Sequence, residues 1–157
     1  MKAARKLALK LAQPADAETI AAMSRELIET GLPWTWTPER VARSLRHPET
    51  LVLTARDAEH LAGFAIMQLG DERAHLSLLA VHPDYQRQGV GRRMLEWLTA
   101  SALTAGIASV RLELRETNLA ARRFYLALGY AETARIPAYY SGVETAVRML
   151  REIRIKP

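Results

Sequence analysis

Apolar and polar residues alternate along this chain with two different periods, which separates the expected strands from the expected helices. Lys6–Leu11 alternates charged and apolar residues with a period of two, and this pattern predicts a strand. Asp16 is placed to cap a helix that runs to about Thr30, because Gly31 follows where a helix commonly ends. The chain is therefore expected to begin with a strand and a helix.

A second helix is expected over 38–46, because Thr37 followed by Pro38 is typical of an N-cap and a first helical turn. Between the two helices lies the apolar loop Gly31–Trp36, which contains Trp34. Tryptophans in such a loop either pack against the core or line a substrate entrance. The sequence leaves both interpretations open.

Three segments with the alternation of strands come next, separated by turn residues at Asp57 and Gly70. These segments are Thr50–Ala55, His60–Leu69 and Arg73–Val81. Their close spacing predicts an antiparallel meander. The segment that follows, from about Gly89 to Ala105, has apolar residues at helical spacing and is expected to be a helix.

The rest of the chain continues to mix strands with helices. It contains an expected strand over Ser109–Arg115, a helix from the N-cap Asn118 to Leu128, and strands near Tyr130–Ile136 and Val143–Ile153. This order indicates a mixed α/β fold. A length of 157 residues suits one hydrophobic core, so residues 1–157 are expected to form a single domain.

Composition narrows the class of protein. Apolar residues make up 49% and charged residues 25%, and no apolar run is long enough to cross a bilayer. Lys10 interrupts the apolar stretch that would form the core of a signal peptide, so no cleaved signal is expected. The chain has no cysteine, which excludes disulfides, thiolate catalysis and Cys-ligated zinc. We expect a cytoplasmic protein.

Net charge is +5, and the arginines are scattered along the chain. A basic surface attracts anions, including phosphorylated cofactors and nucleic acid. Because the arginines form no long basic run, nucleic-acid binding is not the favoured interpretation. His75 and His82 have no spacing that would indicate a metal site, and no metal is expected.

The loop Gln86–Gly91 is the strongest candidate for binding an anion. It connects an expected strand to an expected helix, whose first turn presents unpaired backbone N–H groups and the positive end of the helix dipole. Gly89 and Gly91 allow a phosphate to approach the backbone, and Arg87 and Arg92 add positive charge. The spacing fits neither the dinucleotide fingerprint nor the P-loop. Taken alone, the two glycines are equally compatible with a tight turn.

Two segments resemble conserved stretches of the GNAT superfamily of N-acetyltransferases. Leu79–Gly91 is similar to the acetyl-CoA motif, whose core is Q/R-x-x-G-x-G/A, and the stretch from Leu112 to Tyr130 is similar to the second conserved region. Within the superfamily, the chain most resembles the bacterial ribosomal-protein-alanine N-acetyltransferases. The resemblance implies a mostly antiparallel sheet of about seven strands, flanked by about four helices, with a splayed strand pair at the cofactor cleft.

The same resemblance implies which residues bind acetyl-CoA, the expected co-substrate. The backbone of the splayed strand would bind the pantetheine arm and the acetyl carbonyl, the loop and helix start would hold the pyrophosphate, and an asparagine would contact the cofactor further along. The strand residues are Leu79, Ala80 and Val81, and the asparagine is Asn118. The residues of the loop and helix start are Arg87, Gln88, Gly89, Val90, Gly91 and Arg92. Asparagine is also a good N-cap, and the two roles of Asn118 are compatible with each other.

Acetyl transfer requires a neutral amine, so a base or a water path must accept a proton. Glu113 alternates with apolar residues on its strand, between Arg111 and Arg115. By itself this pattern suits a surface ladder of ion pairs. The resemblance assigns Glu113 the position of the catalytic glutamate, and partial burial in a cleft would raise the pKa of its carboxyl group.

Tyr125 occupies the position of the family's catalytic tyrosine, whose phenol would protonate the leaving thiolate; packing is the alternative explanation. Tyr139 and Tyr140 resemble the paired tyrosines that shape the peptide entrance. Their surroundings depart from the family pattern, since Ser141 replaces a proline. The expected acceptor is the N-terminal α-amine of a protein, such as a ribosomal protein. The alternatives are a small amine or amino acid, or an inactive domain that binds CoA or nucleic acid.

Overall fold

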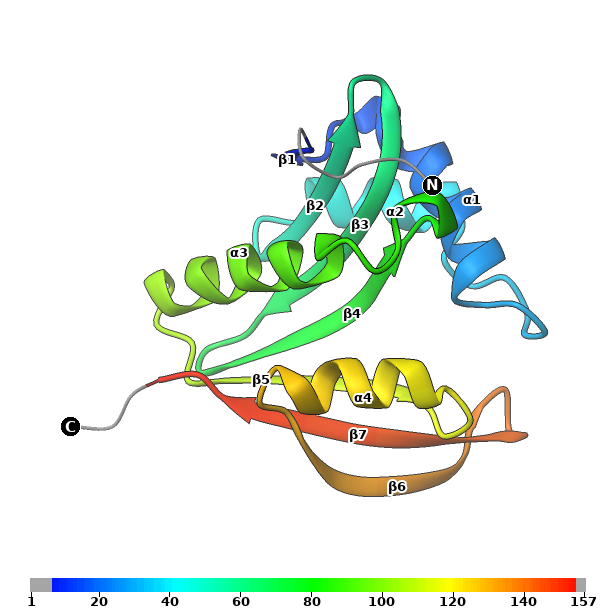
Figure 1. The fold of residues 1–157 in the computed structure, drawn as a ribbon, viewed down its shortest axis with the longest axis vertical. Coiled ribbons are helices and arrows are strands. Elements are labelled where there is room, and N and C mark those ends of the chain that lie inside the picture. The colour runs from blue at the N-terminus through cyan, green and yellow to red at the C-terminus, as the bar shows by residue number, and fades with distance from the viewer. Residues whose placement is uncertain (1–6, 155–157) are drawn as a thin grey trace.

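A single seven-stranded sheet with helices on both faces organises the protein (Figure 1). The computed structural model describes residues 7–154. In chain order its elements are β1 (Ala8–Leu11), α1 (Ala17–Leu27), α2 (Pro38–Arg46), β2 (Thr50–Asp57), β3 (His60–Leu69), β4 (Arg73–Val81), α3 (Val90–Thr104), β5 (Ser109–Arg115), α4 (Leu119–Ala127), β6 (Ala131–Tyr140) and β7 (Glu144–Glu152). Short 3₁₀ turns occupy Pro14–Asp16 and Pro83–Tyr85.

The strands lie in the order β1-β2-β3-β4-β5-β7-β6. Neighbouring strands pair antiparallel throughout, except for the parallel pair β4–β5 that α3 connects. The predicted meander and the predicted mostly antiparallel mixed sheet are therefore confirmed. Within residues 7–154, no helix is both long and apolar enough to cross a membrane.

Most element boundaries agree with the sequence pattern, but α1 ends earlier than expected and β6 continues past Ile136 to Tyr140. The helix stops at Leu27 instead of about Thr30, because the Ser24 carbonyl accepts the backbone N–H groups of both Ile28 and Glu29. Asp16 stands at the N-cap position, yet its side chain does not cap the helix. Its carboxylate instead accepts the Gln13 N–H and pairs with Arg56. Lys6 and the basic start of the chain lie outside the described residues.

Two hydrophobic clusters lie on opposite faces of the sheet. The first packs α3 and α4 against the sheet through Met94, Leu95, Leu98, Leu112 and Tyr125, among others. The second packs α1 and α2 against the other face through Ile20, Val41, Phe64, Ile66 and Leu78, among others. The amphipathic stripe predicted for α3 is the buried face that makes the first cluster.

Strand β4 changes direction at a β-bulge, and this bulge opens the sheet. Leu76 lies opposite Met67 and Leu78 lies opposite Ile66, so Ser77 is an extra residue on β4. Because a bulge reverses the alternation of faces, Leu76 packs in the first cluster and Leu78 in the second. Pairing between β4 and β5 extends only over Arg73–His75, and beyond that point the two strands diverge (Figure 1). The splayed strand pair that we expected is present.

Candidate active site

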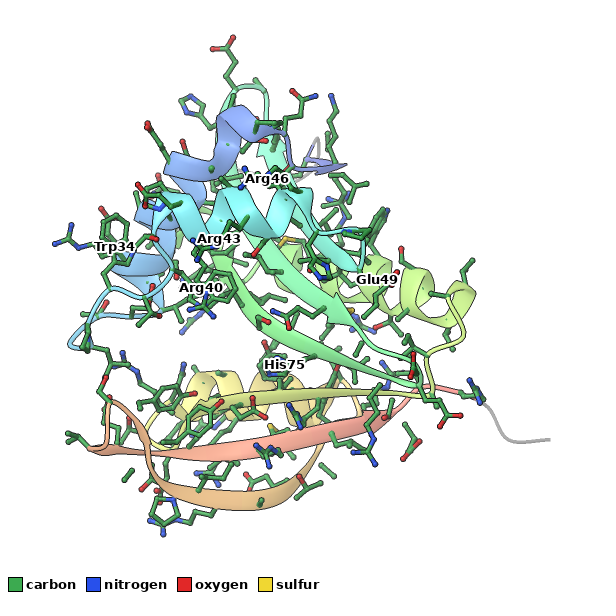
Figure 2. All side chains as sticks on the ribbon, turned by 180° about the vertical axis from the view of Figure 1, so that it is seen from behind. Trp34, Arg40, Arg43, Arg46, Glu49 and His75 are labelled. Carbon is green, nitrogen blue, oxygen red and sulfur yellow. The ribbon has the colours of Figure 1, made fainter. Side chains whose placement is uncertain are left out.

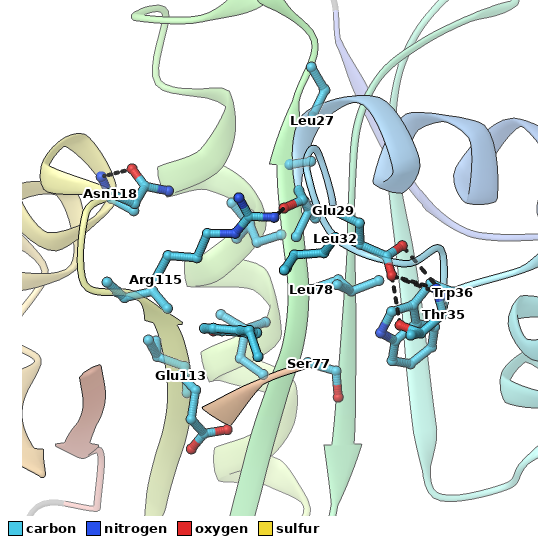
Figure 3. Close-up of a pocket in the computed structure, with 18 of the residues that line it drawn as sticks. Leu27, Glu29, Leu32, Thr35, Trp36, Ser77, Leu78, Glu113, Arg115 and Asn118 are labelled. Carbon is cyan, nitrogen blue, oxygen red and sulfur yellow. Dashed lines mark hydrogen bonds between the residues drawn. The ribbon is translucent and has the colours of Figure 1, made fainter. Parts of the chain in front are cut away.

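A cavity of about 650 Å³ occupies the opening between β4 and β5 (Figure 3). Its walls come from β4, β5, the loop between α1 and α2, the start and middle of α4, and the turn between β6 and β7. The predicted site residues that line it are Leu79, Ala80, Val81, Glu113, Asn118, Tyr125, Tyr139 and Tyr140. Residues from both halves of the sheet thus meet in one place.

The predicted anion loop lies beside this cavity, which extends as far as Gln86. Gly89 is the N-cap of α3 and has a φ of 78°, and Arg87 has a φ of 61°. Left-handed residues of this kind are components of the backbone nests that bind anions. A Cβ atom added to Gly89 would meet nothing within 4 Å, so the space beside its Cα is open to a ligand. The loop therefore fits a phosphate group at the start of α3.

Gly91 is a glycine for a different reason. A Cβ atom at this position would lie 3.2 Å from the Phe124 ring, so Gly91 allows α3 and α4 to pack closely. The loop itself is anchored to the sheet, because the Tyr85 hydroxyl donates to Asp57 at 2.5 Å and the Gln86 amide donates to the Val81 carbonyl at 3.0 Å. An anchored loop loses little freedom when it binds a ligand.

Glu113 lies at the centre of a charged network where β4 and β5 separate. Its Oε1 atom is 2.7 Å from Nε2 of His75, and its Oε2 atom accepts a 2.9 Å hydrogen bond from Nε of Arg148. Arg111 is also close, with its Nε atom 3.4 Å from Oε2. The Glu113 side chain is only 5% exposed, although it lies on the strand face opposite the apolar residues of β5. Glu113 therefore belongs to a ladder of ion pairs and also lines the cavity.

The expectation of a raised pKa for Glu113 was wrong. Burial does raise the pKa of this carboxyl group. The hydrogen bonds from His75 and Arg148 and the charges of His75 and Arg111 together outweigh burial and lower the pKa to about 2. Glu113 is thus a carboxylate at neutral pH. Such a group orients and stabilises a cation well, but it accepts a proton poorly.

Tyr125 is buried in the first cluster and also lines the cavity. Its ring makes edge-to-face contacts with Phe124 at 5.0 Å and with Tyr130 at 5.5 Å between centroids. Burial and the neighbouring Tyr130 raise the pKa of the Tyr125 phenol, so it keeps its proton at neutral pH. The side chain therefore has the protonation state that a proton donor requires, in addition to a packing role.

Asn118 caps α4, as the sequence predicted, because its Oδ1 atom accepts the Ala121 N–H at 3.1 Å. The residue also lines the cavity, where Figure 3 shows it at the end of β5. The rings of Tyr139 and Tyr140, which also line the cavity, meet edge-to-face at 5.0 Å, and the Tyr139 hydroxyl lies 3.4 Å from Oε1 of Glu113. The tyrosine pair thus reaches the same carboxylate that His75 contacts.

Trp34 does not line the cavity. Its indole N–H donates to the Ala21 carbonyl at 3.2 Å, and the Arg25 guanidinium lies 5.0 Å above its ring. Trp36 lines the cavity instead, with Arg40 stacked 3.8 Å from its ring centroid. Of the two tryptophans in this loop, the second is therefore the one positioned at the cavity.

Several cavity residues were not singled out from the sequence. Glu29 is buried, and its carboxylate accepts hydrogen bonds from the Ser24 hydroxyl, the Thr35 hydroxyl and N–H, and the Trp36 N–H (Figure 3). His75 was considered only as a metal ligand, and the described residues contain no group of three or more His, Cys, Asp or Glu that could hold a metal ion. A signal for His75 was present in the two alternating strands 73–81 and 109–115. If these strands are paired in parallel, His75 and Glu113 are neighbours.

Comparison with known proteins places this arrangement among acetyltransferases. The family model described as Acetyltransferase (GNAT) family matches residues 20–130. The chain is 36% identical over 138 residues to the [ribosomal protein bS18]-alanine N-acetyltransferase of Salmonella typhimurium, which covers 78% of this chain and 92% of that protein.

Solved structures of acetyltransferases are similar to this protein in fold. The crystal structure of the ribosomal-protein-S18-alanine N-acetyltransferase from Escherichia coli superposes with a TM-score of 0.83 at 29% identity, covering 97% of each chain. An aminoglycoside 6′-N-acetyltransferase solved in complex with coenzyme A superposes with a TM-score of 0.77 at 18% identity, over 96% of this chain and 99% of that one. The latter likeness shows a shared fold.

Proposed function

The chain belongs to the acetyltransferase (GNAT) family and is an N-acetyltransferase; from this premise we propose that it transfers the acetyl group of acetyl-CoA to the N-terminal α-amine of a protein, such as a ribosomal protein. The cavity between β4 and β5 is the observation that carries the proposal. It brings a buried carboxylate, Glu113, and a protonated phenol, Tyr125, to one space that opens beside the anion loop. Two named N-terminal acetyltransferases of ribosomal proteins, one a sequence relative and one a structural neighbour, support the choice of acceptor.

The residues divide into a cofactor side and an acceptor side. The N–H groups of the loop at Arg87–Arg92 would hold the pyrophosphate of acetyl-CoA, and the edge of β4 that no longer pairs with β5 would bind the pantetheine arm through its backbone. Acetyl-CoA supplies an acetyl group activated as a thioester. Tyr125 would donate its proton to the leaving sulphur, and Asn118 would contact the cofactor while it caps α4.

The acceptor would enter between the loop that follows α1 and the tyrosines at the β6–β7 turn. Tyr139 and Tyr140 line this part of the cavity and provide flat surfaces against which a peptide backbone can pack, and the buried Trp36 supports the facing wall. The Glu113 carboxylate lines the same cavity, where His75 and Arg148 contact it. Because ribosomal proteins are made in the cytoplasm, the proposal includes a cytoplasmic location.

A panel of acceptors, read by release of free thiol from acetyl-CoA, tests the proposal. We expect release with a peptide that begins with a free alanine amine, and none with the same peptide blocked at that amine but carrying a lysine. A set of small amines and amino acids is the second arm. Turnover with the small amines alone would reject the protein acceptor, and turnover with the blocked peptide would reject the α-amine.

A further inference from the structure

His75 stands where β4 and β5 separate, and it contacts Glu113 directly. In Figure 2 it lies on β4 close to the point where the two strands meet. Its side chain is 29% exposed and lines the cavity, whereas the Glu113 side chain is 5% exposed. Of the two groups, the imidazole is therefore the more accessible to a ligand in the cavity.

We infer that His75 is the group that accepts the proton from the incoming ammonium, and that Glu113 positions the imidazole and stabilises its charged form. Imidazole is the side chain that ordinarily gains and loses a proton near neutral pH, which is what a base must do for each turnover. The inference rests on the proposed function for its acceptor.

The hydrogen bonds determine which ring nitrogen of His75 carries the hydrogen and which carries the lone pair. Nε2 of His75 is 2.7 Å from Oε1 of Glu113, and because this carboxylate carries no proton, the hydrogen must lie on Nε2. Nδ1 then carries the lone pair, with the Ser77 hydroxyl 3.4 Å away. Ser77 is the extra residue of the β4 bulge and also lines the cavity. The lone pair thus lies on the side of the ring that faces Ser77, and both residues line the cavity.

The alternative base, Glu113, is poorly matched to the task. A carboxylate whose pKa is about 2 would take a proton from an amine whose pKa is near 8 with an equilibrium penalty of roughly 10⁶-fold. The same carboxylate is well suited to hold an imidazolium, as buried carboxylates do beside catalytic histidines. This division of roles also explains why Glu113 is buried while His75 is partly exposed.

The surroundings of His75 are consistent with a group that changes charge. Glu113 and its partners Arg111 of β5, Arg148 of β7 and Tyr139 of β6 are charged or titratable groups around it. The other charged or titratable residues that line the cavity are Glu29, Arg40, Arg115, Tyr125 and Tyr140. Gln68, its partner on β3, is uncharged. His75 thus has positive and negative groups around it, and its closest contact is with the Glu113 carboxylate.

The proton balance of the step is complete. The ammonium gives one proton to Nδ1 of His75, which later releases it to water. The neutral nitrogen then forms a bond to the acetyl carbon as the carbon–sulphur bond breaks. Tyr125 gives its proton to the sulphur, and the second proton leaving the nitrogen restores the phenol. The products are the acetylated amine, the free thiol and one proton in solution.

Replacing the base while keeping its contact with Glu113 tests the inference, and His75→Gln does so. We expect kcat/KM for the peptide to fall roughly 100-fold at pH 7, with unchanged affinity for acetyl-CoA by calorimetry. The defect should shrink by about tenfold at pH 9.5, because an amine with a pKa near 8 deprotonates there without help. His60→Gln, at the exposed first residue of β3, is the matched control and should behave as the wild type.

Two results would overturn the inference: a wild-type pH profile for His75→Gln, or a defect of the same size from pH 6 to pH 9.5. Nitrogen-15 NMR of the free protein gives a readout without turnover. We expect the neutral His75 ring to carry its proton on Nε2, and Glu113→Gln to weaken this preference; a ring protonated on Nδ1 would contradict the assignment. If the wild type acetylates no amine at all, the proposed function fails, whereas the NMR result still decides the state of His75.

Discussion

Tyr125 and Tyr130 are buried side by side, but Tyr125 lines the cavity and Tyr130 does not. We predict that Tyr125→Phe lowers kcat roughly 100-fold, because the leaving sulphur loses its proton donor, while the Kd for acetyl-CoA changes little. Steady-state kinetics and calorimetry measure the two quantities.

Tyr130→Phe is the matched control for Tyr125. The Tyr130 hydroxyl is buried and has no hydrogen-bond partner among residues 7–154, so its removal should leave both turnover and stability nearly unchanged. Equal turnover in the wild type and Tyr125→Phe would remove Tyr125 from the mechanism. An equal loss in both variants would indicate a packing role.

Gly89 and Gly106 form a second pair that separates ligand binding from backbone strain. Their φ values are 78° and 86°, and a Cβ atom at either would meet nothing within 4 Å. Replacement by valine should cost each protein about 1–2 kcal/mol of unfolding free energy in urea, because side chains disfavour this conformation. We predict that Gly89→Val also weakens acetyl-CoA binding, and that Gly106→Val does not.

Calorimetry of the two glycine variants distinguishes the explanations of the loop. A Kd that rises only for Gly89→Val identifies a phosphate site. Unchanged affinity for acetyl-CoA in Gly89→Val would indicate that the loop is a tight turn and not a phosphate site. At the residue scale, the structure places Tyr125 in the cavity and the predicted loop beside it, while the roles assigned to them stay predictions. The sequence singled out Trp34, but Trp36 lines the cavity, because alternation does not specify which indole a loop turns inward.

The loop between α1 and α2 is fixed by one buried carboxylate, that of Glu29. Its hydrogen bonds to Thr35 and Trp36 hold the wall of the cavity that carries the Trp36 ring. Glu29→Gln removes the charge from these bonds, so we predict a loss of about 1–3 kcal/mol of unfolding free energy and a higher KM for the peptide. Urea unfolding and kinetics measure the two effects.

Glu26→Gln, at an exposed glutamate of α1, is the control for Glu29. Amide hydrogen exchange should become faster over residues 30–37 in Glu29→Gln and stay at the wild-type rate in the control. Exchange that is unchanged in both variants would show that the carboxylate does not hold the loop. The sequence offered no signal for this residue, because an isolated glutamate after a helix is ordinarily a solvated one.

Glu113 connects three strands, since it contacts His75 on β4 and Arg148 on β7. Its pKa is lowered from 4.5 to about 2, so the stability that its carboxylate contributes is present above pH 4.5 and is lost as the pH falls through 2. We predict that the difference in unfolding free energy between the wild type and Glu113→Gln narrows over this interval.

Urea unfolding at a series of pH values measures the effect of Glu113. Glu116→Gln is the control, because the exposed partner of Glu116, Arg135, makes a surface ion pair that contributes little. A difference between the wild type and Glu113→Gln that stays constant from pH 6 to pH 2 would contradict the lowered pKa. The strand pattern suggested only burial, which would raise the pKa of Glu113. The pKa is lowered instead, because charged partners of Glu113 come from strands distant in sequence.

At the scale of the whole molecule, the order of strands and helices could be predicted from hydrophobic periodicity, since each element buries one face. The separation of β4 from β5 was expected only from the family resemblance. Its cause, the extra residue Ser77, is invisible to periodicity because a bulge is defined by the partner strand. The two clusters share one sheet, and we infer that residues 1–157 act as a single domain.

The central claim is that this molecule acetylates the N-terminal α-amine of a protein, and mass spectrometry of the host proteome tests it most directly. Cells that lack the protein would be compared with cells that express it, for every detectable protein N-terminus. We predict that at least one N-terminus, among ribosomal proteins first of all, loses its acetyl group when the protein is absent and regains it on re-expression. Identical N-terminal acetylation in both kinds of cell would contradict the account.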